Sequence, residues 1–151
     1  MINYRKATFN DVEPIFELVN MYAQEGMMLA RSRNALYETL RDMYIAEEDG
    51  ELLGVAGLHI VWEKLAEVRT LAVAKKALRR GIGGTLVKMV IEEGKAIGIS
   101  RVFTLTYQEK FFSTLGFKTV TKDHMPQKVW KDCIDCPKFP NCDEIAMEKY
   151  V

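Results

Sequence analysis

The sequence predicts a mixed α/β domain, in which helices flank a sheet that is mostly antiparallel but contains one parallel pair of strands. Three observations predict this class: a strong hairpin signal, a glycine-rich turn that leads into a long amphipathic helix, and a strand, helix and strand in succession around that turn. The chain has 151 residues, of which 48% are hydrophobic. Because this is the size of an ordinary domain with its own core, we expect a single domain over residues 1–151.

The charges are balanced, with 21 Lys plus Arg and 21 Asp plus Glu, so the formal net charge is zero. No overall field therefore attracts the chain to nucleic acid or to an anionic membrane. The uncharged central run 52–62 is too short to span a bilayer, and residues 1–6 show no secretory signal. We expect a cytoplasmic protein that binds neither nucleic acid nor membrane, and the sequence leaves a homodimer open.

The N-terminal part predicts a short strand followed by two helices. The strand covers Ile2–Ala7, and a cap at Asn10–Glu13 begins a helix with apolar residues at helical spacing. These residues are Val12, Ile15, Phe16, Val19 and Tyr22. Gly26 ends this helix, and Ser32 caps the second one. The second helix is expected to present three apolar residues on one side: Leu36, Leu40 and Met43.

The middle of the chain predicts three strands. Tyr44–Glu47 and Leu52–Val61 flank Asp49-Gly50, which accepts the positive φ angles of a tight hairpin turn. Along Leu65–Val73 the apolar residues occupy even positions first and odd positions later. Since a strand alternates with period two, this change of phase predicts a β-bulge near residues 69–70.

The C-terminal half predicts the longest helix and two further strands. Gly81–Ile97 has two apolar rows beside a charged face, and Gly98 ends it. Arg101–Thr106 is typical of a buried strand, Glu109–Leu115 of a short helix, and Glu144–Tyr150 of a final alternating strand. The strand before the long helix and the strand after it are therefore expected to be parallel neighbours.

A basic loop at residues 74–80 and three glycines precede and open the long helix: Gly81, Gly83 and Gly84. Glycines let main-chain amides approach an anion closely, and a helix N-terminus adds a partial positive charge. The pattern predicts a phosphate or pyrophosphate site. A Walker loop is disfavoured because no lysine precedes Thr85, and a dinucleotide fingerprint because Leu86 stands where its third glycine is needed.

Together, the bulged strand, the basic loop, Arg80-Gly81-Ile82-Gly83, the long helix and Phe111–Phe117 resemble the GNAT family of acetyl-CoA-dependent N-acetyltransferases over nearly the whole chain. The resemblance implies the GNAT fold, in which the bulged strand and its parallel neighbour splay apart, and acetyl-CoA as cosubstrate. It implies that main-chain groups of Leu71 and Val73 contact the acetyl-pantetheine arm. It also implies a pyrophosphate site of six residues: Arg79, Arg80, Gly81, Gly83, Gly84 and Thr85. The family's usual Arg or Gln three residues before the first glycine is Leu78 here, which predicts weaker CoA affinity.

Acetyl transfer needs a neutral amine, donors for developing negative charge and a proton for the departing thiolate. Glu67 on the bulged strand is the candidate base, because a carboxylate acting through water suffices for an α-amine with a pKa of about 8. An outward-facing strand carboxylate is the alternative interpretation of Glu67. Many GNAT enzymes have a Tyr acid where this chain has Phe112. Tyr107 is the candidate replacement, with His59 as the alternative.

Three segments resemble the short, single-domain amino-acid N-acetyltransferases assigned to N-acetylglutamate synthesis in arginine biosynthesis: Glu25–Ser32, Trp62–Arg69 and Lys128–Cys133. This narrower resemblance implies an amino-acid acceptor, glutamate first and glutamine or aspartate next. Guanidinium and ammonium groups suit the two carboxylates of glutamate. We expect Arg31 and Lys128 to bind these carboxylates, and Arg33 and Arg69 are the next candidates. Two alternatives stay open: a GNAT enzyme for another small amine or a protein N-terminus, and a non-catalytic CoA-binding sensor.

The three cysteines form one C-terminal cluster: Cys133, Cys136 and Cys142. A zinc site would need a fourth ligand from three candidates: Asp132, Asp143 and His124. An odd number of cysteines does not make a disulfide framework for a core of this size, although two of the three could form one disulfide. We expect reduced thiols and no metal.

Overall fold

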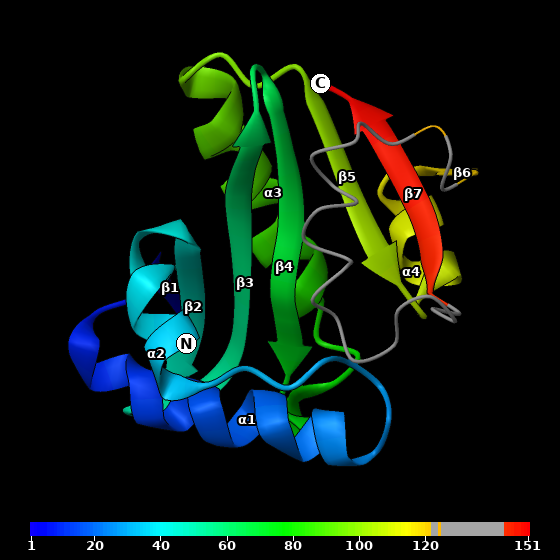
Figure 1. Ribbon diagram of the computed structural model, residues 1–151. Coiled ribbons are helices and arrows are strands. Elements are labelled where there is room, and N and C mark those ends of the chain that lie inside the picture. Colours follow the sequence, from blue (N-terminus) through cyan, green and yellow to red (C-terminus); the bar gives the residue numbers. More distant parts are fainter. Residues whose placement is uncertain (122–123, 125–143) are drawn as a thin grey trace.

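The computed structural model describes residues 1–121, 124 and 144–151, which form a seven-stranded sheet in the order β1-β2-β3-β4-β5-β7-β6 with helices on both faces (Figure 1). The strands are β1 (Asn3–Lys6), β2 (Met43–Glu48), β3 (Glu51–Trp62), β4 (Leu65–Val73), β5 (Arg101–Thr106), β6 (Lys118–Val120) and β7 (Ile145–Tyr150). The helices are α1 (Val12–Gln24), α2 (Arg33–Glu38), α3 (Ile82–Ala96) and α4 (Glu109–Thr114), with 3-10 turns η1 (Phe9–Asp11), η2 (Leu40–Asp42) and η3 (Lys75–Ala77). The strand pairs are antiparallel apart from β4 and β5, which confirms the predicted mixed sheet.

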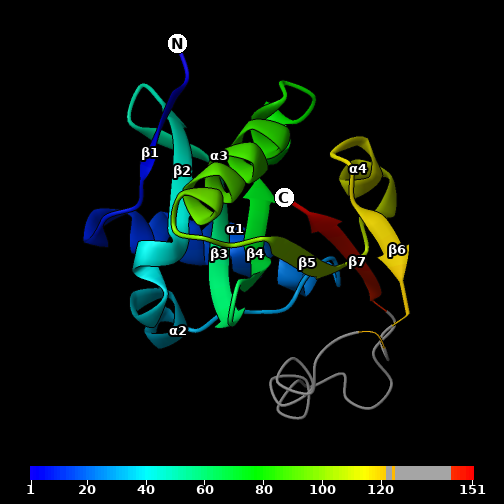
Figure 2. The ribbon, with the colours of Figure 1, turned by 90° about the horizontal axis from the view of Figure 1, so that it is seen from above.

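The helices cover the sheet in two layers. On one face, α1 and α2 bury an apolar row against β2, β3 and β4: Val12, Ile15, Val19 and Leu36. On the other face, α3 and α4 share a cluster with β4, β5 and β7, and Figure 2 shows these two helices on the same side of the sheet. Because both faces of the central strands are covered, β3 and β4 carry runs of buried residues rather than a simple alternation.

The predicted hairpin joins β2 and β3. Asp49 and Gly50 both adopt positive φ, at 53° and 77°, as a two-residue turn of this kind requires. The predicted bulge is also confirmed. Thr70 has a φ of 59°, and the register passes from Gly57↔Arg69 to Val55↔Ala72, so β4 holds one residue more than β3 at this point.

The parallel pairing of β4 with β5 is short. It joins Leu65–Glu67 to Arg101–Phe103 and ends there, although β4 continues to Val73 and β5 to Thr106. The two strands diverge towards their C-terminal ends, as Figure 1 shows. The splayed parallel pair that the sequence predicts is therefore present.

Two sequence expectations are wrong in detail. Met43 does not extend the second helix: η2 intervenes after α2, and Met43 begins β2, where it is buried opposite Gly57. The pairing of Met43 with β3 in the sheet outweighs the preference for a helix that its spacing from Leu40 indicated. The short strand β6 was not expected either. It pairs with β7, and its three residues are too few to show an alternating pattern.

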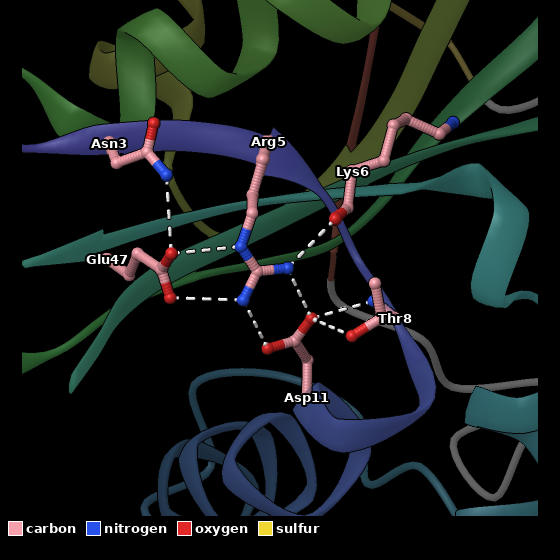
Figure 3. A network of polar contacts seen from close by, with 6 residues as sticks. All are labelled: Asn3, Arg5, Lys6, Thr8, Asp11 and Glu47. Carbon is pink, nitrogen blue, oxygen red and sulfur yellow. Dashed lines mark hydrogen bonds and ion pairs between the residues drawn. The ribbon is translucent and has the colours of Figure 1, made fainter. Parts of the chain in front are cut away.

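A polar network joins the start of α1 to the edge of the sheet (Figure 3). The guanidinium of Arg5 on β1 forms two hydrogen bonds of 2.8 and 2.9 Å with the carboxylate of Asp11, and Arg5 Nε lies 2.9 Å from Glu47 on β2. Asp11 also accepts a 2.7 Å hydrogen bond from the Thr8 amide. Burial alone would raise the pKa of Asp11, but the bonds from Arg5 and Thr8 outweigh it and hold the pKa below its ordinary value.

Within the described ranges, no helix combines the length and the apolar character needed to cross a membrane.

Asp11→Asn is expected to lower the free energy of unfolding by about 1–3 kcal/mol at neutral pH, because the Arg5 guanidinium loses one of its two anionic partners and keeps only Glu47. The folded-state pKa of Asp11 lies below the unfolded one, so this stabilisation is present above about pH 4 and is lost as the pH falls through the folded value. Urea denaturation at neutral and acidic pH measures both effects, and the difference between the two proteins should shrink in acid. The control is Glu13→Gln, which removes an exposed ion pair with Arg33 and should change the stability little.

Candidate active site

A cavity of about 600 Å³ opens where β4 and β5 diverge. Its walls come from the end of α1 and the loop after it, from β4, from the turn before α3, and from the end of β5 with α4. Most of the side chains and main-chain groups predicted for the site line it: Arg31, Glu67, Arg69, Leu71, Val73, Arg79, Gly81, Gly83, Gly84 and Tyr107. Segments far apart in the sequence therefore meet in one place.

The glycine turn brings main-chain donors to this cavity. Arg79 and Gly81 both have positive φ, at 67° and 77°, and α3 begins immediately afterwards. The first amides of a helix have no acceptor within the helix, so those of Gly83 and Gly84 are available to an anion at this point. Gly81 is needed because few side chains tolerate its left-handed conformation.

The cations around the turn are mostly held by carboxylates. Arg80 pairs with Glu48 at 3.2 Å, and the ammonium of Lys76 pairs with Glu51, so both are tied to the β2–β3 hairpin. Arg80 and Thr85 are not among the described residues that line the cavity. The Thr85 hydroxyl instead donates to the carbonyl of Gly81 at 2.9 Å, which stabilises the turn from within.

The opposite end of the cavity is rich in charged side chains. Glu67 accepts a hydrogen bond of 2.5 Å from Arg69 Nε, and both side chains are largely buried. Arg31 reaches the cavity from the loop after α1, and its main chain is held by Asn20. The Asn20 side chain donates to the Arg31 carbonyl at 3.0 Å and accepts from the Arg31 amide at 3.3 Å.

Two other predicted residues lie elsewhere. Arg33 is outside the described lining of the cavity: it pairs with Glu13 at 2.6 Å and lies over the ring of Phe16. His59, the alternative acid, is 2.7 Å from Asp42 and lines a separate small cavity beside Arg31 and Arg69.

The remaining candidates of the sequence analysis belong to the C-terminal segment. Lys128 and the three cysteines lie outside the described residues. His124, considered above as a metal ligand, is described and lies 3.0 Å from the buried carboxylate of Glu148.

The sequence analysis missed three residues that shape this site: Asn20, Tyr22 and Thr104. Tyr22 lines the cavity but was assigned to the core by its helical spacing. The sequence did contain one signal for Tyr22, namely a phenol at the end of an apolar row. A buried Tyr hydroxyl usually has a hydrogen-bond partner, so this residue could have been identified as more than a core residue. The sequence contains no comparable signal for Asn20 or Thr104, because their partners are main-chain groups of distant segments.

These features fit a nucleotide thioester such as acetyl-CoA. The turn offers main-chain amides and the Arg79 side chain to a pyrophosphate, and the gap between the strands offers a channel for an extended arm. Leu78, which stands in place of the family's usual Arg or Gln, lies at this end with an exposed side chain.

The sequence model of the acetyltransferase (GNAT) family matches residues 8–117, so the chain belongs to this family of acetyltransferases, with acetyl-CoA as cosubstrate. An uncharacterized N-acetyltransferase of Chlorobaculum tepidum is 38% identical over 149 residues, covering 96% of this chain and 94% of that protein. An amino-acid acetyltransferase of Mycobacterium tuberculosis is 33% identical over 119 residues, covering 77% of this chain and 68% of that protein.

The fold is similar to that of N-acetylglutamate synthase from Neisseria gonorrhoeae, solved in complex with coenzyme A and N-acetyl-glutamate. The TM-score is 0.90 at 28% identity. The match covers 99% of this chain but 35% of the synthase chain, so this chain corresponds to about a third of that protein. The predicted family and fold are thereby confirmed.

Gly81→Ala is expected to weaken CoA binding several-fold and to destabilise the fold by about 1–2 kcal/mol, because alanine disfavours a left-handed conformation. Gly98→Ala is the matched control. Gly98 also has a positive φ, at 100°, but lies outside the described lining of the cavity, so its substitution should destabilise the fold while CoA affinity is retained. Calorimetric titration with CoA and thermal unfolding measure the two effects. Equal CoA affinity for both variants would contradict the importance of the turn.

Proposed function

We propose that the chain acetylates the α-amine of an amino acid, with glutamate as the first candidate and glutamine or aspartate next. The observation that supports this most directly is the composition of the cavity. Arg31, Arg69 and Glu67 line the cavity together with the glycine turn, Arg69 is hydrogen-bonded to Glu67, and Arg31 and Arg69 also share a second small cavity that the turn does not line. The relative named amino-acid acetyltransferase supports an amino-acid acceptor, and the similar fold of N-acetylglutamate synthase supports glutamate as the first candidate. In a cytoplasmic protein such a reaction would serve arginine biosynthesis.

At the nucleotide end, we propose that the main chain of Leu71 and Val73 contacts the acetyl-pantetheine arm. The pyrophosphate is assigned to Arg79 and to the amides of the glycine turn: Gly81, Gly83 and Gly84. Arg80 and Thr85 contribute indirectly, since their observed partners are Glu48 and the Gly81 carbonyl, and these contacts hold the turn in place. Acetyl-CoA, when bound, supplies the acetyl group as an activated thioester.

At the acceptor end, Glu67 is the proposed general base. An amino-acid α-amine has a pKa of about 8, so a carboxylate that acts through one water is sufficient to remove its proton near neutral pH. The contact with Arg69 fixes the orientation of the Glu67 carboxylate. Tyr107, at the end of β5, is the proposed acid that returns a proton to the thiolate sulfur.

The acceptor's carboxylates are assigned to guanidinium groups. Arg31 and Arg69 line the cavity, and Arg31 is oriented by the two hydrogen bonds between its main chain and Asn20. Lys128 stays a proposed third cation. Arg33 is left out of the proposed site, because its contacts with Glu13 and Phe16 hold it against α1, outside the described lining of the cavity.

A panel of amino acids assayed with acetyl-CoA for thiol release tests the acceptor. We expect turnover with glutamate, and we expect Arg31→Ala to raise the glutamate KM by about tenfold or more, because a charge-assisted pair to a carboxylate is lost. The matched control is Arg33→Ala, which should keep the wild-type KM.

The same panel separates the alternatives. Turnover with an unrelated amine but not with glutamate would move the assignment to another small amine or a protein N-terminus. CoA binding without thiol release for any amine would indicate a non-catalytic sensor.

Glu67→Gln tests the base. We expect kcat to fall by about 100-fold or more, and we expect the acidic limb of the pH profile to change, because a titrating group has been removed. The measurement is kcat/KM for glutamate as a function of pH. Loss of activity with an unaltered profile would mean that Glu67 is important for structure rather than as the base.

A further inference from the structure

Between Glu67 and Val73, the main chain of β4 beside the cavity is not paired with β5. The pairing of β4 with β5 ends at Glu67. A buried carbonyl needs a hydrogen-bond donor, and two side-chain hydroxyls supply one at the two ends of this stretch. Thr104 donates to the carbonyl of Val68 at 3.2 Å, and Tyr22 donates to the carbonyl of Val73 at 2.6 Å.

Thr104 lies at the point where the strands separate. In the parallel register it is the residue of β5 that follows the last pair, Glu67↔Phe103, and Val68 is the corresponding residue of β4. The Thr104 side chain is 3% exposed. A side-chain hydroxyl therefore stands between the two strands at the first position where main-chain pairing has stopped.

Tyr22 acts at the other end of the same stretch. It belongs to the last part of α1, the helix that passes below the end of β4 in Figure 1, and it lines the cavity. Burial raises the pKa of its phenol, an effect that the nearby Lys75 opposes and Glu25 reinforces, so the hydroxyl stays protonated and can donate at neutral pH. Its acceptor is the last residue of β4 before the chain enters η3.

We propose that Thr104 and Tyr22 are positioning residues that hold β4 away from β5 and so keep the channel for the acetyl-pantetheine arm open. Each hydroxyl satisfies a β4 carbonyl that would otherwise favour a main-chain donor of β5. The bond to the Val68 carbonyl is buried and the bond to the Val73 carbonyl is part-buried. Loss of a hydroxyl leaves its carbonyl without that donor, and closing the gap between the strands is the local way to satisfy it. The inference rests on the proposed function in one respect, namely that the arm occupies this gap.

The Thr104 pair of variants tests the first contact. Thr104→Val keeps the shape of the side chain and removes its hydroxyl, whereas Thr104→Ser keeps the hydroxyl. We expect Thr104→Val to raise the Kd for CoA and the KM for acetyl-CoA by about tenfold, with the acceptor KM unchanged, since an unpaired buried acceptor has an effect of this order. Thr104→Ser should restore CoA affinity to near the wild-type value.

Tyr22→Phe tests the second contact, with Tyr44→Phe as its matched control. Tyr44 also makes a phenolic hydrogen bond, 2.7 Å to Glu93, and lies outside the described lining of the cavity. We expect Tyr22→Phe to raise the Kd for CoA several-fold, and Tyr44→Phe to leave it unchanged. This comparison separates a role in the channel from the general effect of losing a phenolic hydroxyl.

A ligand-free measurement separates this inference from the proposed function. Amide hydrogen exchange at residues 104–106 should be slower in Thr104→Val than in wild type if β4 closes on β5. Unchanged or faster exchange there, together with a wild-type Kd for CoA in Tyr22→Phe, would overturn the inference. If Thr104→Val does not fold, Tyr22→Phe and Thr104→Ser decide it, and a wild-type Kd in Tyr22→Phe overturns it. Failure of wild type to bind CoA would instead overturn the proposed function.

Discussion

A β-bulge in β4 gives this strand one residue more than β3 at the point where the two pair, and Thr70 in the bulge has a left-handed conformation. The bulge lies just beyond Glu67, where the pairing of β4 with β5 ends, and the two strands diverge from there (Figure 1). The cavity exists because the two strands diverge, and each of its walls is defined relative to them. Along this stretch the side chains of Thr104 and Tyr22 donate hydrogen bonds to the carbonyls of Val68 and Val73 on β4.

The electrostatics of the nucleotide end follow from pairing between neighbouring loops. Lys76 and Arg80 belong to the basic loop, yet both are held by carboxylates of the β2–β3 hairpin. The proposed pyrophosphate site therefore consists chiefly of Arg79 and the main-chain amides of the glycine turn, which line the cavity. A turn whose geometry is fixed by φ angles and internal hydrogen bonds would need little rearrangement to bind a diphosphate.

The acceptor end depends on a different kind of support. Its charged side chains come from a loop and a strand, and each has a partner that fixes its direction: Asn20 on α1 holds the main chain of Arg31, and Arg69 holds the carboxylate of Glu67. The start of α1 is in turn attached to the sheet by Arg5 and Asp11. Helix α1 thus connects the edge of the sheet to both ends of the cavity, since Tyr22 near its C-terminus contacts β4.

Local sequence determined the hairpin at Asp49 and Gly50 and the glycine turn before α3, because both features depend on backbone angles that few residues adopt. It also indicated the bulge at Thr70, through the change of phase of the apolar residues along β4. The resemblance of these segments to a known family placed most of the cavity's residues in advance. Tertiary structure alone decided which cations line the cavity: Arg31 and Arg79 belong to its described lining, whereas Arg33 is held by Glu13 and Arg80 by Glu48 outside that lining. It also decided the roles of Asn20, Tyr22 and Thr104. Their partners are main-chain groups of residues distant in sequence. No local sequence pattern predicts which carbonyls lack a main-chain hydrogen-bond donor when two strands diverge.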